Sequence, residues 1–184
     1  MPSCWSWSER GLRIGEAVAL QWGDVDFQGR FLHVQRNYVD GHIYSPKSGR
    51  SRRVDMSPHL TETLWTLRGR RKEETLRRGW QGMPDWIFTT AAGTHLDPDN
   101  FRVRVWAKIP TRGGLHMIRL HDLRHTFASL LIEQGAPLTY VKEQMGHHSI
   151  RVTVDTYGHL VPGGNRAEVD KLDESIPHTQ KVKK

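Results

Sequence analysis

Cysteine and long apolar runs are what this sequence has least of. Its only cysteine is Cys4, so neither an intrachain disulfide nor a thiolate metal cluster can form, and a reducing cytoplasm is the expected compartment. No apolar run approaches the roughly 18 residues of a membrane span, and no membrane partner is expected. Internal repeats and low-complexity blocks are also lacking. What remains is a chain that fits one domain, with or without ragged ends.

Acidic side chains are also outnumbered. The 184 residues include 27 Lys and Arg against 20 Asp and Glu, which gives a formal net charge of +7 and a pI near 9.9. Such a surplus favours a polyanionic partner, because Lys and Arg that neutralise phosphates release counterions and gain affinity. A merely basic protein is the alternative, and composition alone does not separate the two.

The first part of the sequence predicts a helix. Leu12, Val18, Ala19 and Trp22 recur at roughly helical spacing, and residues 23–30 follow as a turn.

A small sheet is predicted next, because residues 30–57 form short runs typical of β-strands. Asp40–Gly41 is a two-residue hairpin signal, and residues 47–50 make a second turn. We expect a three-stranded antiparallel meander, with Lys47 at the edge of its second turn.

Helices dominate the remainder. Ser57 and Pro58 are an N-cap and a first helical residue, and Leu60, Leu64 and Leu67 give that helix a buried face.

Asp97–Pro98 starts another helix, and the clearest helix ends at Gly135. The expected buried face of that clearest helix consists of Leu123, Phe127, Leu130 and Leu131. Two short helices or turns follow in 137–146 and 149–159. The predicted fold class is α+β: a mainly helical domain with a small three-stranded antiparallel sheet.

The segment His121–Arg124 is the first candidate for chemistry. Three residues apart on one helix face, an imidazole and a guanidinium provide a proton handler and a clamp for phosphate oxygens. Taken alone, such a pair is more common on solvated helix surfaces. His121 and His125 also have the spacing of two metal ligands, but no glutamate lies between them and Arg124 does, so no metal site is expected.

Four further features are weak when taken singly. Arg13 precedes Glu16 by three residues, which allows a local ion pair. Lys47 lies on a turn from which it can reach a ligand. His147 follows a helix-ending glycine, and Tyr157 comes ten residues later.

In this order, however, the motifs resemble those of the tyrosine recombinases, the family of phage integrases and Xer-type recombinases. They read GLRIGE, SPKSGRSRR, HDLRHTFAS, MGHHS and TVDTYGH. Only Met145, where the family usually has leucine, departs from the pattern, and that change conserves volume. The resemblance extends from about Gly11 to His159.

The resemblance implies a role for each residue. Arg13 and Arg124 would bind the non-bridging oxygens of the scissile phosphate. Lys47 would protonate the leaving 5′ oxygen, and His121 and His147 would bind the phosphate, with His121 also a candidate for accepting the phenolic proton. Tyr157 would attack phosphorus and form a 3′-phosphotyrosine.

Supporting roles are implied as well. Glu16 would orient Arg13, and we predict DNA contacts for Arg50, Arg52 and Arg53. A free tyrosine has a pKa near 10, and cationic groups around the phosphate would favour its phenolate. The covalent intermediate conserves the energy of the phosphodiester, so neither a metal nor another cofactor is expected.

The partners that the resemblance implies are double-stranded DNA and further copies of the chain, in a tetramer on paired sites. Residues 1–10 look atypical for the family, 11–162 match its catalytic domain, and 163–184 form a tail that could pack on a neighbouring protomer. We therefore expect an N-terminally truncated catalytic domain. A DNA-binding remnant without chemistry, a histidine-rich metal hydrolase and a type IB topoisomerase are the alternatives.

Overall fold

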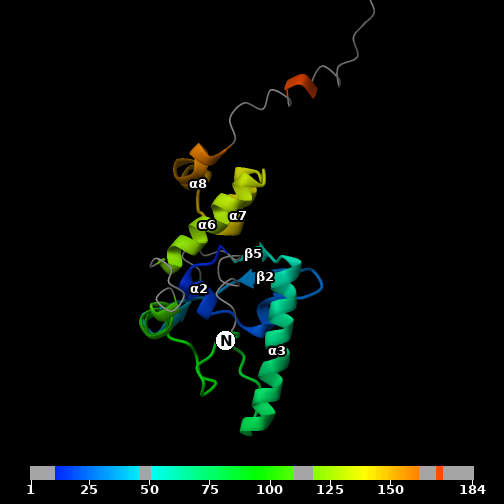
Figure 1. Cartoon of the computed structure of the whole chain (residues 1–184), viewed down its shortest axis with the longest axis vertical. Helices are drawn as coiled ribbons and strands as arrows, with labels where there is room; N and C mark the ends of the chain where they lie inside the picture. The colour runs from blue at the N-terminus through cyan, green and yellow to red at the C-terminus, as the bar shows by residue number, and fades with distance from the viewer. Residues whose placement is uncertain (1–10, 46–50, 110–117, 162–168, 172–184) are drawn as a thin grey trace, which may run out of the picture.

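A computed structural model of the chain describes residues 11–45, 51–109, 118–161 and 169–171. Lys47, Arg50 and most of the predicted tail lie outside these ranges. In Figure 1 the strands β2 and β5 lie at the middle of the described chain, with the long helix α3 along one side and α6, α7 and α8 together at one end. No helix in the described ranges is long and apolar enough to cross a membrane.

The three-stranded antiparallel sheet is present, but its strands are not those of the predicted meander. It has the order β1 (Val25–Asp26), β2 (Phe31–Val34) and β5 (Arg52–Asp55). The Asp40–Gly41 hairpin is confirmed, because both residues have a positive φ between β3 (Asn37–Val39) and β4 (His42–Tyr44).

This hairpin forms a separate two-stranded ribbon. The meander was wrong because β2 pairs with β5, which places Leu32 opposite Val54. Both of these side chains are fully buried, so the pairing of β2 with β5 places apolar side chains in the core. All three residues of β4 are exposed, so pairing with β4 would not do this.

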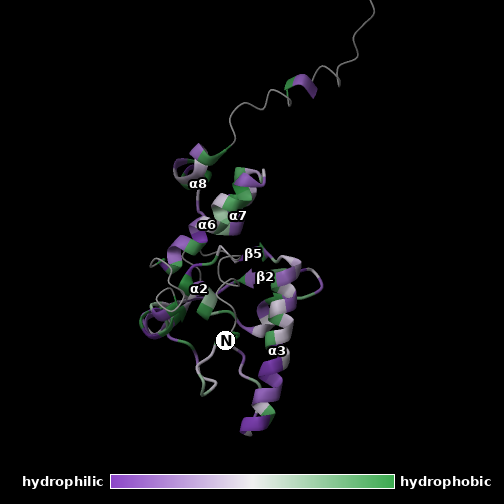
Figure 2. Cartoon of the chain, in the orientation of Figure 1, coloured by the Kyte–Doolittle hydropathy of each residue, from purple (hydrophilic) through white to green (hydrophobic). Residues whose placement is uncertain are grey.

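Helix α3 (Pro58–Arg78) begins as predicted. The hydroxyl of Ser57 accepts the backbone N–H of Leu60 at 3.1 Å, and Leu60 and Leu64 are buried against the sheet. Gly79 ends the helix in the left-handed conformation. Figure 2 shows that the second half of α3 is strongly hydrophilic where it extends away from the sheet.

The first helix is shorter than predicted. Only α2 (Ile14–Val18) is helical, and the short turn η1 (Trp22–Asp24) follows it. The residues 17–20 are consecutive and all buried, so they are covered from every side rather than along one helical face. Gln21 then forms a β-bridge with Trp86, and this extended pairing ends any helical continuation.

The last three helices surround a second apolar cluster. They are α6 (Leu120–Glu133), α7 (Leu138–Met145) and α8 (Ile150–Tyr157), preceded by α4 (Pro98–Phe101) with η2 (Arg102–Trp106) and followed by η3 (Gly158–Leu160). The residues buried in the cluster are Ala128, Ile132, Val141, Met145 and Tyr157.

The buried face of α6 differs from the predicted one. Arg124, Ala128 and Ile132 are its buried residues, whereas Leu130 is 51% exposed. Phe127 and Leu131 lie partly buried against the cluster. The predicted face was therefore right for Phe127 and Leu131 and wrong for Leu130, because the burial of Arg124 rotates the inward face of the helix.

Candidate active site

The candidate site forms where separate segments of the chain meet. The residues before α2 provide Arg13, β5 provides Arg52, and the helices α6, α7 and α8 provide the rest. Arg52 reaches the backbone of α7 through a hydrogen bond from its Nε to the Gln144 carbonyl at 3.4 Å. Arg124 of α6 reaches the backbone of Gly11. The site therefore depends on long-range packing rather than on one local motif.

Glu16 is a buried carboxylate held by two arginines. Arg52 donates from both terminal nitrogens, at 2.9 Å to Oε1 and 2.8 Å to Oε2. Arg13 donates from its side chain at 3.0 Å and from its backbone N–H at 2.8 Å. The predicted Arg13–Glu16 pair is present, and it fixes an arginine side chain that remains 46% exposed.

These contacts decide the protonation of Glu16. Burial alone would raise the pKa of this carboxyl, but the hydrogen bonds and charges of Arg52 and Arg13 outweigh burial and lower the pKa to about 2. The carboxylate is therefore ionised at neutral pH, and it neutralises part of the positive charge in the site.

Acid is expected to destabilise the protein through Glu16. Because the folded-state pKa is about 2 against a reference value of 4.5, the stabilisation is complete above the reference value and is lost as pH falls toward the folded one. The loss corresponds to about 3 kcal/mol of unfolding free energy. Urea unfolding at several pH values between about 6 and 2 measures it. A Glu16→Gln variant should lack this component, and an identical pH profile in both proteins would contradict the assignment.

Arg124 lies inside the protein, with only 4% of its surface exposed. Its two terminal nitrogens donate to the backbone carbonyls of Gly11 and Met145. Burial, followed by the charge of Arg13, lowers the pKa of Arg124 to about 10, so the side chain stays charged at neutral pH. A guanidinium has five N–H donors, and further donors in the same plane can bind an anion.

His147 is held in a neutral state. Burial first, and then the charges of Arg124, Arg13 and Arg52, lower its pKa to about 4. Its Nδ1 lies 2.9 Å from the hydroxyl of Thr153. A neutral ring has one N–H, and an Nδ1 that accepts the threonine hydroxyl leaves this N–H on Nε2, as a donor for a phosphate oxygen.

Tyr157 is nearly enclosed, with 3% of its surface exposed. Its hydroxyl lies 2.7 Å from Nδ1 of His125, and its ring is parallel to that of His147, with centroids 6.4 Å apart. Burial raises the pKa of Tyr157, and the charge of Arg124 opposes this effect. The phenol thus lies next to two imidazoles and within reach of the charge of the buried Arg124.

His121 lies at the exposed start of α6. Its ring meets the ring of His125 edge-on, with centroids 4.7 Å apart. Burial, followed by the charge of the neighbouring His125, lowers the pKa of His121. His121 therefore contacts His125, and His125 in turn contacts the Tyr157 hydroxyl.

The structure brings together most of the predicted site residues. Arg13 contacts Glu16, His147 stacks on Tyr157, and His121 reaches Tyr157 through His125. Arg124 lies close enough for its charge to act on Arg13, Glu16 and Tyr157. Lys47 and Arg50 lie outside the described residues, so their roles stay predictions. Arg53 is exposed and pairs with Asp55 at 3.1 Å.

Arg52 differs most from its expected role. It was predicted to contact DNA, but its side chain is only 14% exposed and binds Glu16. Gly146, at φ +62°, lies directly against it, and an added Cβ there would come within 2.7 Å of Arg52 Nε. A DNA contact of Arg52 stays a prediction, whereas its structural role in holding Glu16 is clear.

Sequence reasoning missed His125 and Gln144. The Gln144 side chain is buried and accepts the backbone N–H of Asp55 at 2.8 Å, which ties α7 to β5. For His125 a signal was available, since it lies next to Arg124 and one turn after His121. That spacing was considered only as a metal motif. For Gln144 the sequence offers no comparable signal.

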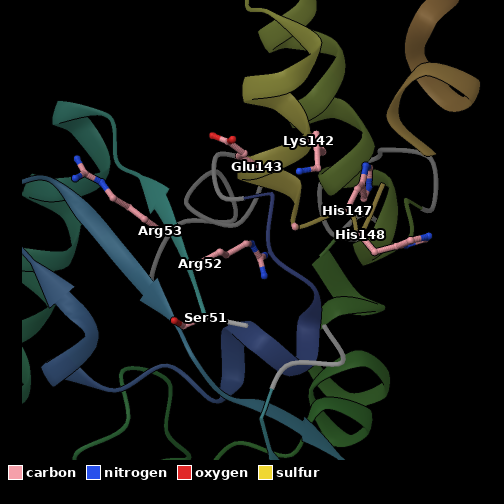
Figure 3. A pocket seen from close by; sticks show the side chains of 8 residues that line it. Ser51, Arg52, Arg53, Lys142, Glu143, His147 and His148 are labelled. Atoms are coloured by element: carbon pink, nitrogen blue, oxygen red, sulfur yellow. The ribbon is translucent and has the colours of Figure 1, made fainter. Parts of the chain in front are cut away.

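A hollow of about 610 Å³ opens beside these residues. It is lined by Ser51, Arg52, Arg53, Lys142, Glu143, Gly146, His147 and His148. Figure 3 shows Arg52 and Arg53 leaving β5 in opposite directions, with Arg52 on the side of His147. The lining is mostly basic or neutral, which suits an anionic backbone.

The donors of this site suit an anion rather than a metal cation. Within residues 11–45, 51–109, 118–161 and 169–171, no three His, Cys, Asp or Glu side chains are grouped so that they could hold a metal ion. Arg124, His125 and the neutral His147 lie near the buried phenol of Tyr157, and Arg13 and Arg52 lie near His147. Such an arrangement can bind a phosphodiester and present a nucleophile to it.

Comparisons with known proteins agree with this geometry. The profile of the phage integrase family matches residues 7–162. A tyrosine recombinase XerC-like protein of Caldanaerobacter subterraneus subsp. tengcongensis is 31% identical over 182 residues, covering 89% of this chain and 46% of that protein. The ICEBs1 integrase of Bacillus subtilis is 34% identical over 173 residues, covering 90% of this chain and 46% of that protein. The chain thus spans about half the length of these curated relatives.

Solved structures show the same fold. The Tn1549 transposon integrase in complex with transposon right end DNA has a TM-score of 0.72 at 23% identity, covering 91% of this chain and 57% of that one. The catalytic domain of bacteriophage HP1 integrase has a TM-score of 0.59 at 20% identity, covering 94% of this chain and 81% of that one. The predicted α+β, mainly helical fold class is confirmed.

Proposed function

Because this chain belongs to the phage integrase family, we propose that it cleaves and rejoins double-stranded DNA through a covalent tyrosine intermediate. The observation that carries the proposal is the position of Tyr157, whose buried hydroxyl lies among His125, His147 and the charge of Arg124. A buried phenol surrounded by phosphate-binding groups suits nucleophilic attack better than packing alone.

In the proposed mechanism the cations bind the scissile phosphate before the attack. Arg13, oriented by Glu16, and Arg124 bind the non-bridging oxygens, and His147 donates from Nε2. Tyr157 attacks phosphorus, so a bond from its Oη to phosphorus forms as the bond to the 5′ oxygen breaks. Lys47 protonates the leaving oxygen. The reverse sequence rejoins the strand, and no external energy is consumed because the phosphodiester is conserved in the intermediate.

Tyr157→Phe is expected to abolish a covalent protein–DNA adduct. The protein is incubated in EDTA with a suicide duplex, from which the short fragment released by cleavage dissociates, so that the strand cannot be rejoined. The trapped adduct is detected on a denaturing gel. Phenylalanine keeps the ring but removes the attacking oxygen, so no adduct should form. Tyr140→Phe is the matched control, since Tyr140 on α7 bonds Asp55 at 3.0 Å. Equal adduct from wild type and Tyr157→Phe would refute the proposal.

The same reaction separates the alternatives. DNA binding without cleavage or adduct would indicate a DNA-binding remnant, and strand cleavage that leaves no adduct and is abolished by EDTA would indicate a metal hydrolase. We also propose that four protomers assemble on two DNA sites in the cytoplasm. Sedimentation of the complex on paired sites measures this assembly, and a single protomer per duplex with strand relaxation would favour a type IB topoisomerase.

A further inference from the structure

The hydroxyl of Tyr157 has a hydrogen-bond partner that the family resemblance did not assign. We infer that His125 holds the Tyr157 phenol through Nδ1 and accepts its proton when the phenol attacks phosphorus. This inference rests on the proposed function, because it concerns the same cleavage step. The family resemblance made His121 the candidate for accepting the phenolic proton. The inference assigns this role to His125 instead, one helical turn further along α6.

The geometry of the pair fits proton transfer. Nδ1 of His125 lies 2.7 Å from the Tyr157 hydroxyl, within the heavy-atom range over which a general base acts. The two residues come from α6 and α8, whose contact is therefore made in part by this hydrogen bond. Tyr157 is 3% exposed, so bulk water competes little for its hydroxyl.

The neighbouring imidazoles are less suited to the role. His147 directs Nδ1 to Thr153 at 2.9 Å, and its burial among arginines makes it a weak base. His121 meets the His125 ring edge-on, whereas the hydrogen bond to the Tyr157 hydroxyl is made by His125. Burial also opposes ionisation of Tyr157, so the attack requires a base at the hydroxyl.

The step balances as a proton transfer coupled to displacement. The O–H bond of Tyr157 breaks and its proton moves to Nδ1 of His125. The Oη–phosphorus bond forms while phosphorus loses the 5′ oxygen, which takes a proton from a separate acid. During rejoining His125 returns its proton to the departing phenolate. His125 therefore acts on the nucleophile and not on the leaving group.

This division between nucleophile and leaving group can be tested with a modified substrate. Single-turnover cleavage is measured on the suicide duplex and on one whose scissile 5′ oxygen is replaced by sulfur. A thiolate leaves without protonation, so cleavage of this substrate no longer needs the general acid at the leaving group. It still needs the general base at the Tyr157 hydroxyl. His125→Ala should cleave both duplexes about 100-fold or more slowly than wild type, whereas His59→Ala, an exposed histidine on α3, should be unaffected.

A more acidic phenol should compensate for the missing base. With 3-fluorotyrosine at position 157, His125→Ala should recover about tenfold or more of its rate, and wild type much less. Full cleavage by His125→Ala, or a defect corrected by the sulfur substrate, would overturn the inference. Both results leave the proposed function intact. Absence of any adduct from wild type would instead overturn the proposed function, and this inference with it.

A conservative variant separates proton transfer from positioning and from misfolding. Asparagine at position 125 can still bond the phenol but cannot accept its proton. His125→Asn should therefore keep a fluorine resonance at position 157 close to that of wild type, without DNA, while cleavage stays slow. Rapid cleavage by His125→Asn would show that His125 only positions the phenol and would overturn its role as proton acceptor.

Discussion

Replacing Glu16 with glutamine is expected to lower the free energy of unfolding by about 3–5 kcal/mol, because it breaks a buried ion pair from one side only. Glutamine cannot neutralise Arg52, which is mostly buried and bonded through both terminal nitrogens. One amide N–H group would also point at a guanidinium. Urea unfolding at neutral pH measures the change.

Glu74→Gln is the matched control for this substitution. Glu74 on α3 also binds two arginines, Arg71 at 2.8 Å and Arg78 at 2.9 Å, but it lies nearer to solvent. Its replacement should cost less than about 1 kcal/mol. Equal losses at both positions would mean that burial of Glu16 contributes little. Combining Glu16→Gln with Arg52→Met should restore part of the stability, since the uncompensated cation is then removed.

Arg124→Lys is expected to slow DNA cleavage by about 100- to 1,000-fold, the usual effect of losing one positioned donor to transition-state charge. Lysine retains the charge but has one nitrogen, so it cannot bond Gly11 and Met145 and also bind a phosphate in one plane. Single-turnover cleavage on the suicide duplex measures the rate, and thermal unfolding confirms that the variant is folded.

Arg119→Lys provides the comparison for Arg124. Arg119 precedes the same helix, but its side chain is 82% exposed and pairs locally with Asp122. Cleavage by this variant should stay within about twofold of wild type. An Arg124→Lys protein that is folded and cleaves at the wild-type rate would remove Arg124 from the proposed mechanism.

The fold was predictable where a few neighbouring residues determine the backbone. Ser57 with Pro58, and Asp97 with Pro98, mark helix starts, and Asp40–Gly41 forms a hairpin turn, all as expected. The pairing of β2 with β5 was not predictable in this way. It depends on Leu32 meeting Val54 in the core, a contact between residues that no local pattern connects.

The site was predictable from ordered motifs more than from any single pattern. Arg13 with Glu16, and Arg124 near Tyr157, lie as the motif order suggests. Composition could not show that Arg124 is buried, because arginine usually lies at the surface. That one departure explains why Leu130 was placed on the inward face of α6, where Arg124, Ala128 and Ile132 are buried instead.

In the proposed mechanism, a chain emerging from the ribosome could complete its site only after Tyr157 has been synthesised. The carbonyl of Gly11 is made early, but Arg124 and then Met145 must follow before the buried guanidinium has both of its partners. Tyr157 appears later still. A nascent chain that has not yet reached Tyr157 would thus have the arginines but not the proposed nucleophile.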